Sequence, residues 1–192
     1  MKKYLEPTEY IDWQQSDVLI KALSLAEGLN SDEEITKACF EFVRDEIKHS
    51  WDFKLNPLTC KASDVLAYGT GYCYAKSHLL AALLRANKIP AGLCYQRLTI
   101  SDDQPPFCLH GLNAAYLKNH GWYRIDARGN KEGVNAQFCP PEEQLAFPII
   151  SDREADLPEI WSEPLQVIVE ALTQNPDIFA VANNLPDIEL LG

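Results

Sequence analysis

Cys73 is the residue whose surroundings best suit nucleophilic chemistry. It follows the turn Gly69-Thr70-Gly71 and opens a segment, Cys73 to Asn87, whose apolar pattern predicts a helix. The unpaired N–H groups and the aligned dipole of a helix N-terminus favour negative charge on such a sulfur, and the same N–H groups can hold an oxyanion. None of the other five cysteines has such a setting; Cys39, for example, falls in the apolar stripe of a predicted helix and is expected in the core.

A thiolate needs a base or an imidazolium beside it, and the four histidines differ as candidates. His49 ends a predicted helix and His120 lies in a turn, so both are expected at the surface. His78 follows Cys73 by five residues, about 140° round the same helix, and should point elsewhere. His110 lies early on a predicted strand. A histidine there is often only a hydrogen-bonded core residue, and it is the combination with Cys73 that favours a catalytic role.

The acid that would orient the imidazole should lie beside His110 on a neighbouring strand. Asp126 closes the segment Trp122–Asp126, which is predicted to return antiparallel to the strand 108–117. The return places Asp126 near the level of His110, and the two share a face if the connecting loop has an odd residue count or a bulge. A carboxylate at an apolar strand end is costly to leave unpaired. The sequence thus proposes Cys73, His110 and Asp126 as one catalytic set.

The elements that must position these residues change from helices to strands along the chain. Helices are predicted from about 16 to 28, from 31 onward, and over 63–67, 73–87, 165–172 and 177–182, and strands over 93–100, 108–117 and 122–127. Helices followed by strands favour an α+β fold over alternating βαβ units. We expect one domain over 1–192, with a core at about 31–130 and an acidic, proline-rich C-terminal wrap at about 140–192.

Composition and charge exclude several classes of function. The 192 residues contain 17 Lys+Arg and 28 Asp+Glu, a formal net charge of −11, whereas binding to nucleic acid or to an anionic membrane requires a basic patch. Residues 140–192 contain eleven acids and one base, Arg153, which indicates a solvated acidic face or a docking surface for a cationic partner. The first residues lack a signal-peptide pattern and no apolar run has membrane-spanning length, so a cytoplasmic location is expected.

The six cysteines are expected as free thiols in such a compartment, and none of them forms a Cys-x-x-Cys pair. Cys108 and His110 are two possible metal ligands on one strand, but no second pair at zinc-finger spacing accompanies them. No metal and no cofactor is therefore expected.

The stretch from Gly69 to Ala91 resembles the nucleophile motif of the transglutaminase-like superfamily: Gly-x-Gly-x-Cys, a leucine-rich helix, then Leu-Arg and Ile-Pro-Ala. His110-Gly111-Leu112-Asn113 is similar to the histidine strand of that family, and Trp122–Asp126 to its strand ending in Asp, with spacings of 37 and 16 residues. The resemblance covers about 35–130. It implies a papain-like α+β fold in which the cysteine helix packs on an antiparallel sheet carrying the His and the Asp.

The resemblance also implies a reaction. The Cys73 thiolate would attack a carboxamide, release ammonia or an amine and hold the acyl group as a thioester, with His110 as general acid and then base and Asp126 as the orienting acid. Trp51 is a candidate second oxyanion donor by analogy alone, or else a core aromatic. Leu112 stands where the family usually has Trp and Asn113 where it has an acid, so the groove beside His110 is expected to differ from that of enzymatic relatives.

The sequence therefore predicts a cofactor-free thiol enzyme that acts on an amide of a protein, peptide or small molecule, with water favoured as acyl acceptor. Two alternatives remain. One is the transglutaminase reaction, in which an amine replaces the carboxamide nitrogen of a protein glutamine. The other is a non-catalytic binding module that keeps the fold and the triad and engages a partner through its acidic C-terminal region.

Overall fold

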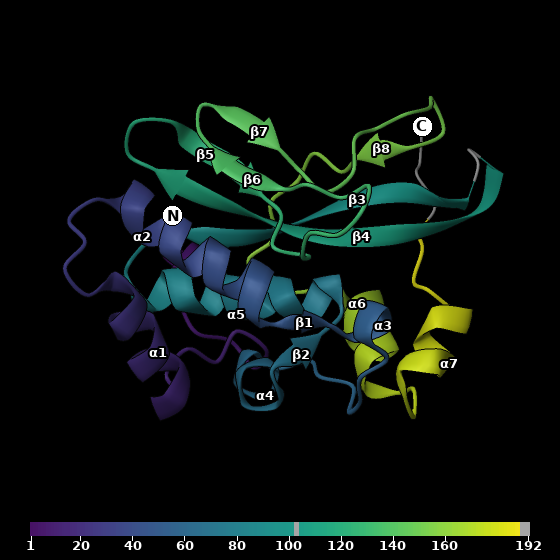
Figure 1. Ribbon diagram of the computed structural model, residues 1–192, viewed down its shortest axis with the longest axis horizontal. Helices are drawn as coiled ribbons and strands as arrows, with labels where there is room; N and C mark the ends of the chain where they lie inside the picture. The colour runs from purple at the N-terminus through teal and green to yellow at the C-terminus, as the bar shows by residue number, and fades with distance from the viewer. Residues whose placement is uncertain (102–103, 189–192) are drawn as a thin grey trace.

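The computed structural model describes residues 1–101 and 104–188 and has two main layers (Figure 1). One layer is an antiparallel sheet with strand order β5-β4-β3-β8, and the other is a group of helices beneath it. The sheet consists of β3 (Ala91–Ser101), β4 (Gln104–Leu117), β5 (Gly121–Ile125) and β8 (Ala155–Asp156). The larger helices are α1 (Ser16–Ala26), α2 (Asp32–Glu41), α4 (Ala62–Tyr68), α5 (Cys73–Ala86), α6 (Gln166–Thr173) and α7 (Ile178–Asn183).

Short elements complete the fold. They are the 3-10 turn η1 (Lys2–Tyr4), the π-helical turn η2 (Phe42–Glu46), α3 (Ser50–Phe53), the parallel pair β1 (Lys48–His49) and β2 (Thr70–Gly71), and the hairpin β6 (Gln137–Cys139) with β7 (Glu142–Gln144). The predicted helices and strands are all present, with ends that differ by a few residues. The short elements were not predicted, because pairs of two or three residues leave no periodic pattern in the sequence.

Helix α5 is the centre of the molecule and is buried on every side. Residues 73–85 are all buried, and α1, α2 and α4 contact the helix together with β3 and β4. The sequence suggested one inward face; the structure shows that this helix has no solvent face before Ala86. Burying each of its leucines favours folding by about 1.5–3 kcal/mol. The position of Cys73 is consequently fixed by the core.

The turn before Cys73 is shaped by two glycines with different roles. Gly69 ends α4 with a φ of +64°, which a residue without a Cβ adopts at no steric cost. Gly71 lies so close to its neighbours that a Cβ would come within 3.1 Å of the Ala75 Cβ and 3.2 Å of the Thr59 Oγ1. Gly71 also pairs with His49 in the β1–β2 ladder, so this turn brings His49 beside the start of α5.

A capping box begins α2. The Ser31 hydroxyl accepts from the Glu34 N–H, and the Glu34 carboxylate accepts from the Ser31 N–H. The helix predicted from residue 31 onward ends as α-helix at Glu41 and continues as η2. The wider turn keeps Val43 fully buried and releases the chain into β1.

The β4–β5 hairpin sets the register of the two other candidate residues. Leu117 pairs with Gly121 and Asn113 with Ile125, so the loop consists of residues 118–120. This odd count is the condition under which Asp126 and His110 share a face of the sheet, as predicted. Gly121 accommodates the loop with a φ of +74°.

No helix in the described part of the chain is long and apolar enough to cross a membrane.

The contact between α5 and β4 at Gly111 offers a test of this packing. A Cβ at Gly111 would lie 2.9–3.2 Å from atoms of Tyr74, including its backbone N and Cα. Gly111→Ala should therefore force β4 away from α5 and lower the free energy of unfolding by about 1–3 kcal/mol, measured by urea denaturation. Lys118→Ala, at an exposed position just beyond β4, is the control and should leave the midpoint unchanged. Equal midpoints for both variants would refute this close packing.

Candidate active site

His110 and Asp126 form a buried pair. The His110 Nε2 lies 2.7 Å from the Asp126 Oδ2, with side-chain exposures of 5% and 0%. The carboxylate also accepts the Ala146 N–H at 3.0 Å and the Arg128 N–H at 3.1 Å. Burial alone would raise the pKa of Asp126, but the charge and hydrogen bond of His110 and these two N–H groups hold it below its ordinary value. Asp126 is therefore an ionised acceptor that fixes the orientation of the ring.

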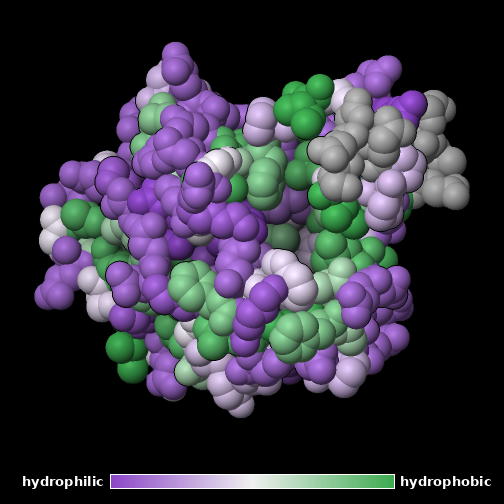
Figure 2. Space-filling view, turned by 45° about the vertical axis from the view of Figure 1, so that its right-hand side comes forward, coloured by the Kyte–Doolittle hydropathy of each residue, from purple (hydrophilic) through white to green (hydrophobic). Residues whose placement is uncertain are grey.

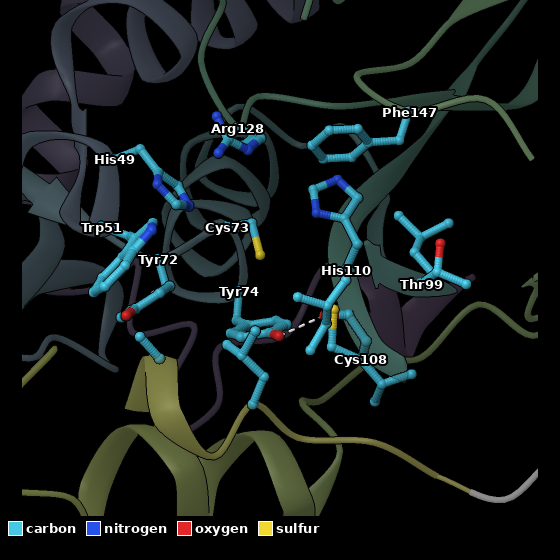
Figure 3. Close-up of a pocket in the computed structure, with 15 residues that line it drawn as sticks. His49, Trp51, Tyr72, Cys73, Tyr74, Thr99, Cys108, His110, Arg128 and Phe147 are labelled. Atoms are coloured by element: carbon cyan, nitrogen blue, oxygen red, sulfur yellow. Dashed lines mark hydrogen bonds between the residues drawn. The ribbon is translucent and has the colours of Figure 1, made fainter. Parts of the chain in front are cut away.

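The other ring nitrogen of His110, Nδ1, is left for Cys73. Figure 3 shows the Cys73 sulfur and the His110 ring facing the same cleft. Burial lowers the pKa of His110, but the charges of Asp126 and Cys73 and hydrogen bonds to both side chains raise it to about 10. Phe147 packs against the ring edge to face, with centroids 4.9 Å apart. The histidine thus lies between a carboxylate that favours its protonation and the Cys73 sulfur.

Cys73 is the first residue of α5, as predicted. The first backbone bond of the helix runs from the Lys76 N–H to the Tyr72 carbonyl at 2.9 Å. The N–H groups of Cys73, Tyr74 and Ala75 precede it and have no acceptor within the helix. Such groups favour an anion at the helix end, either a thiolate or the oxyanion of a substrate.

A cleft of about 370 Å³ lies beside Cys73 and His110, and most of its wall is apolar. Figure 2 shows hydrophobic side chains gathered around a hollow on this side of the molecule. The apolar wall includes Leu98, Ile100, Leu109, Phe147, Ala182 and Leu185. Leu98, Ile100 and Leu109 come from β3 and β4, whereas Ala182 and Leu185 come from a distant part of the chain.

His49 was expected at the surface, and this expectation was wrong. Its residue exposure is only 6%, and it lines the cleft opposite His110 (Figure 3). Burial and the nearby charge of Arg128 hold the pKa of His49 well below its ordinary value, so the ring is neutral. Its Nδ1 lies 3.5 Å from the Asp52 Oδ2, too far for a hydrogen bond. The misassignment arose because His49 belongs to strand β1 rather than to a helix end.

Arg128 and Asp52 join the two sides of the cleft. Two guanidinium nitrogens of Arg128 lie 2.7 and 3.2 Å from the Asp52 carboxylate, and Lys131 adds a bond at 2.8 Å. Burial opposes ionisation of Asp52, but the hydrogen bonds from Arg128 and Lys131 bring its pKa down to about 2. This pair ties α3 to the loop after β5. This ion pair was not predicted from the sequence, in which the one indication of it is that Arg128 follows Asp126 by two residues.

Lys76 is a second residue that the sequence did not reveal. It lies one turn after Cys73, is fully buried, and donates to the Ile47 carbonyl. Burial, together with the charge of Arg128, lowers its pKa to about 7. Its bond to the segment before β1 helps to hold His49 against α5.

The other residues considered from the sequence are His78, His120 and Trp51. His78 is buried, with Nδ1 2.7 Å from the Cys60 carbonyl, and His120 is exposed near Glu33, as predicted for both. Trp51 is not a core aromatic: it is 37% exposed, lines the cleft, and packs edge to face on Phe179.

The two positions that depart from the family pattern do not line the described cleft. Leu112 is buried in a small cluster on the face of the sheet away from α5. Asn113 donates to the Ser77 and Gly92 carbonyls at 2.9 and 3.2 Å, tying α5 to the sheet. The departure from the family pattern at these two positions therefore concerns packing behind the site, and the expected difference in the groove beside His110 does not come from them. Among residues 1–101 and 104–188, no three His, Cys, Asp or Glu side chains are placed to hold a metal ion.

The sequence profile of the transglutaminase-like superfamily matches residues 21–127, more than half of the chain, and this range includes Cys73, His110 and Asp126. The chain belongs to the transglutaminase-like superfamily. No curated protein sequence matches it significantly.

Comparison with solved structures concerns the fold. A proposed cysteine protease from Cytophaga hutchinsonii is similar at 23% identity and a TM-score of 0.51, over 65% of this chain and 40% of that one. The periplasmic domain of TgpA from Pseudomonas aeruginosa has 15% sequence identity and a TM-score of 0.48, over 65% of this chain and 45% of that one. Red sea bream transglutaminase has 12% identity and a TM-score of 0.41, over 58% of this chain and 26% of that one. Each match spans less than half of the other chain. Family and first structure confirm the predicted transglutaminase-like, papain-like α+β fold.

The electrostatic coupling of His110 to Asp126 is directly measurable. Asp126→Asn removes the negative charge that favours the imidazolium, while burial of the ring persists, so the pKa of His110 should fall from about 10 to about 6.5 or lower. Titration of the His110 ring by NMR measures this change. Asp45→Asn, which removes an acid bound to Arg44 instead, is the control. A His110 pKa that is the same in both variants would contradict the assignment.

Proposed function

We propose that this protein is a thiol-dependent acyl-transfer enzyme that acts on an amide through a thioester on Cys73, with water as the acyl acceptor. The observation that supports it most is the His110–Asp126 bond of 2.7 Å beside a cysteine at the N-terminus of a buried helix. Membership of the transglutaminase-like superfamily supports the same chemistry.

The first half of the reaction forms the thioester. His110 Nδ1 takes the proton of Cys73, and the thiolate attacks the carbonyl carbon of the amide. Negative charge moves to the carbonyl oxygen, where the free N–H groups at the start of α5 stabilise it. The imidazolium then protonates the leaving nitrogen, the C–N bond breaks, and ammonia or an amine departs. Asp126 keeps the ring aligned and its charge balanced throughout.

The second half reverses these roles. Neutral His110 takes a proton from water, the oxygen attacks the thioester, and the C–S bond breaks to give a carboxylic acid and the Cys73–His110 pair again. A primary amine in place of water would give a new amide. We favour water because no separate amine site is evident among the described residues of the cleft.

The rival role, a binding module that uses its acidic C-terminal region, has less support. Several of these acids are engaged within the chain rather than free for a partner. Glu143 and Asp156 both pair with Arg124 at 2.7 Å, and Glu154 accepts the Thr99 and Ile150 N–H groups. Part of the expected solvated acidic face is therefore engaged in ion pairs and hydrogen bonds with other residues of the chain.

The reactivity of the thiols tests the first step. Burial raises the pKa of Cys39, Cys60, Cys94 and Cys108 to about 12, so these thiols are protonated at neutral pH. Cys73 should react with iodoacetamide at about pH 6.5 at least about tenfold faster than the exposed Cys139, the internal reference. Rates come from isotope-coded alkylation and peptide mapping.

The control is His110→Gln, which removes the imidazole and should bring the Cys73 rate down to that of Cys139. Equal rates for Cys73 and Cys139 in the unaltered protein would count against an activated thiol.

The acyl acceptor is identified by isotope labelling. With peptides from a cell digest in ¹⁸O-water plus labelled methylamine, we expect ¹⁸O in newly formed carboxyl groups and an acid-trapped thioester on Cys73. Cys73→Ala should show neither, because no thioester can form. Methylamine incorporation above ¹⁸O would favour amine transfer, and an unmodified Cys73 with unchanged peptides would favour the binding module.

A further inference from the structure

The cleft beside Cys73 contains little that could stabilise a charged ligand. Its walls are mainly apolar, and the charged groups among its described lining residues are already paired. Arg128 is bound to Asp52 and His110 to Asp126, while His49 is neutral. A charged side chain entering this cleft would lose its hydration without gaining a partner. An apolar side chain would lose nothing.

Among residues 1–101 and 104–188, no strand pairs with one side of β4 next to this cleft. Strand β5 reaches only as far as the Ile125–Asn113 pair, so the residues of β4 before Asn113 have no β5 neighbour. At Leu109 the N–H and the carbonyl both point to this open edge: the N–H donates to the Pro186 carbonyl at 2.7 Å, and the carbonyl accepts the Tyr74 hydroxyl. An open edge of this kind can add an extended peptide by main-chain hydrogen bonds.

A segment of this chain already lies there in such a manner. Residues 184–188, here called the C-terminal strap, have no helix or strand and run from α7 past the cleft. Leu185 contributes its side chain to the cleft wall, and Pro186 makes the bond to Leu109. One backbone bond to the edge and one apolar side chain in the cleft are the contacts that an extended peptide would make.

One of the side-chain contacts of the strap is an ion pair that solvent can reach. Asp187 binds Arg97 through two contacts of 2.7 Å, with side-chain exposures of 33% and 16%. Arg97 also stacks over the Phe107 ring at 3.9 Å. Partly exposed pairs contribute modestly to stability, so the strap can lose this contact at little cost.

We propose that the acyl-donor substrate is an extended peptide with an apolar side chain, which binds along the edge of β4 at Leu109 in place of the C-terminal strap. This inference rests on the proposed function and adds its substrate class. The strap acts as a competing pseudo-substrate, so that its release increases access to Cys73.

Two peptidyl chloromethyl ketones, identical except for leucine or aspartate next to the ketone, test the substrate class. The Cys73 sulfur displaces chloride, a C–S bond replaces the C–Cl bond, and the thiol proton passes to His110. We expect the leucine probe to label Cys73 at least about tenfold faster, because the aspartate must be desolvated unpaired. Ile100→Lys, a half-exposed position on the cleft wall, should reduce or reverse this preference.

A second variant tests the strap. Asp187→Ala removes the ion pair to Arg97 and should raise the rate of the leucine probe by about threefold or more, because the open state becomes more populated. Iodoacetamide is small, and its rate should change little. Glu159→Ala, an exposed acid elsewhere in the C-terminal region, is the matched control and should behave as the unaltered protein.

The outcomes separate this inference from the proposed function. Fast iodoacetamide labelling of Cys73 with equal rates for both peptidyl probes would overturn the apolar substrate class and leave the thiol enzyme intact. An Asp187→Ala rate equal to that of Glu159→Ala would overturn the competing strap. Slow iodoacetamide labelling of Cys73 would overturn the proposed function, and this inference with it.

Discussion

The burial of α5 from Cys73 to Arg85 is the constraint on which the rest of this structure depends. A helix with no solvent face cannot shift or rotate without opening the core, so its first residue occupies one place only. The contacts that fix it come from both layers: Gly111 admits Tyr74 at van der Waals distance, and Asn113 bonds to the Ser77 carbonyl. The same packing that stabilises the fold therefore sets where the Cys73 sulfur lies relative to β4.

Placing ionisable groups in this dry interior is unfavourable unless each has a partner. In this structure each of two carboxylates binds several partners rather than one. Asp126 receives His110 and two backbone N–H groups, and Asp52 receives Arg128 and Lys131. Asp126, Arg128 and Lys131 all lie in the loop after β5. The loop after β5 thus supplies both the acid that pairs with His110 and the cations that pair with Asp52.

Much of this arrangement could be predicted from the sequence, and the reason is periodicity. The apolar pattern identified α5, and the odd loop at 118–120 placed Asp126 on the face of His110. His49, Phe147 and Leu185 could not be assigned in this way, because each reaches the cleft through long-range packing. His49 depends on a two-residue ladder with Gly71, and Leu185 lies more than 70 residues beyond its neighbour Leu109. Local pattern predicts elements, whereas the walls of a cleft come from how distant elements meet.

The C-terminal strap shows how one contact can meet two requirements. An open strand edge invites pairing with other chains, and proteins usually cover such edges. At Leu109 the cover is an extended segment whose bond to β4 uses its backbone, so it depends on no special side chain. Any extended peptide can make the same bond, and selection must then come from the side chain that enters the cleft. That cleft is mainly apolar and its charged groups are paired, so it favours an apolar side chain. The segment of β4 around Leu109 therefore both needs a cover for its edge and lies beside the surface that selects the ligand.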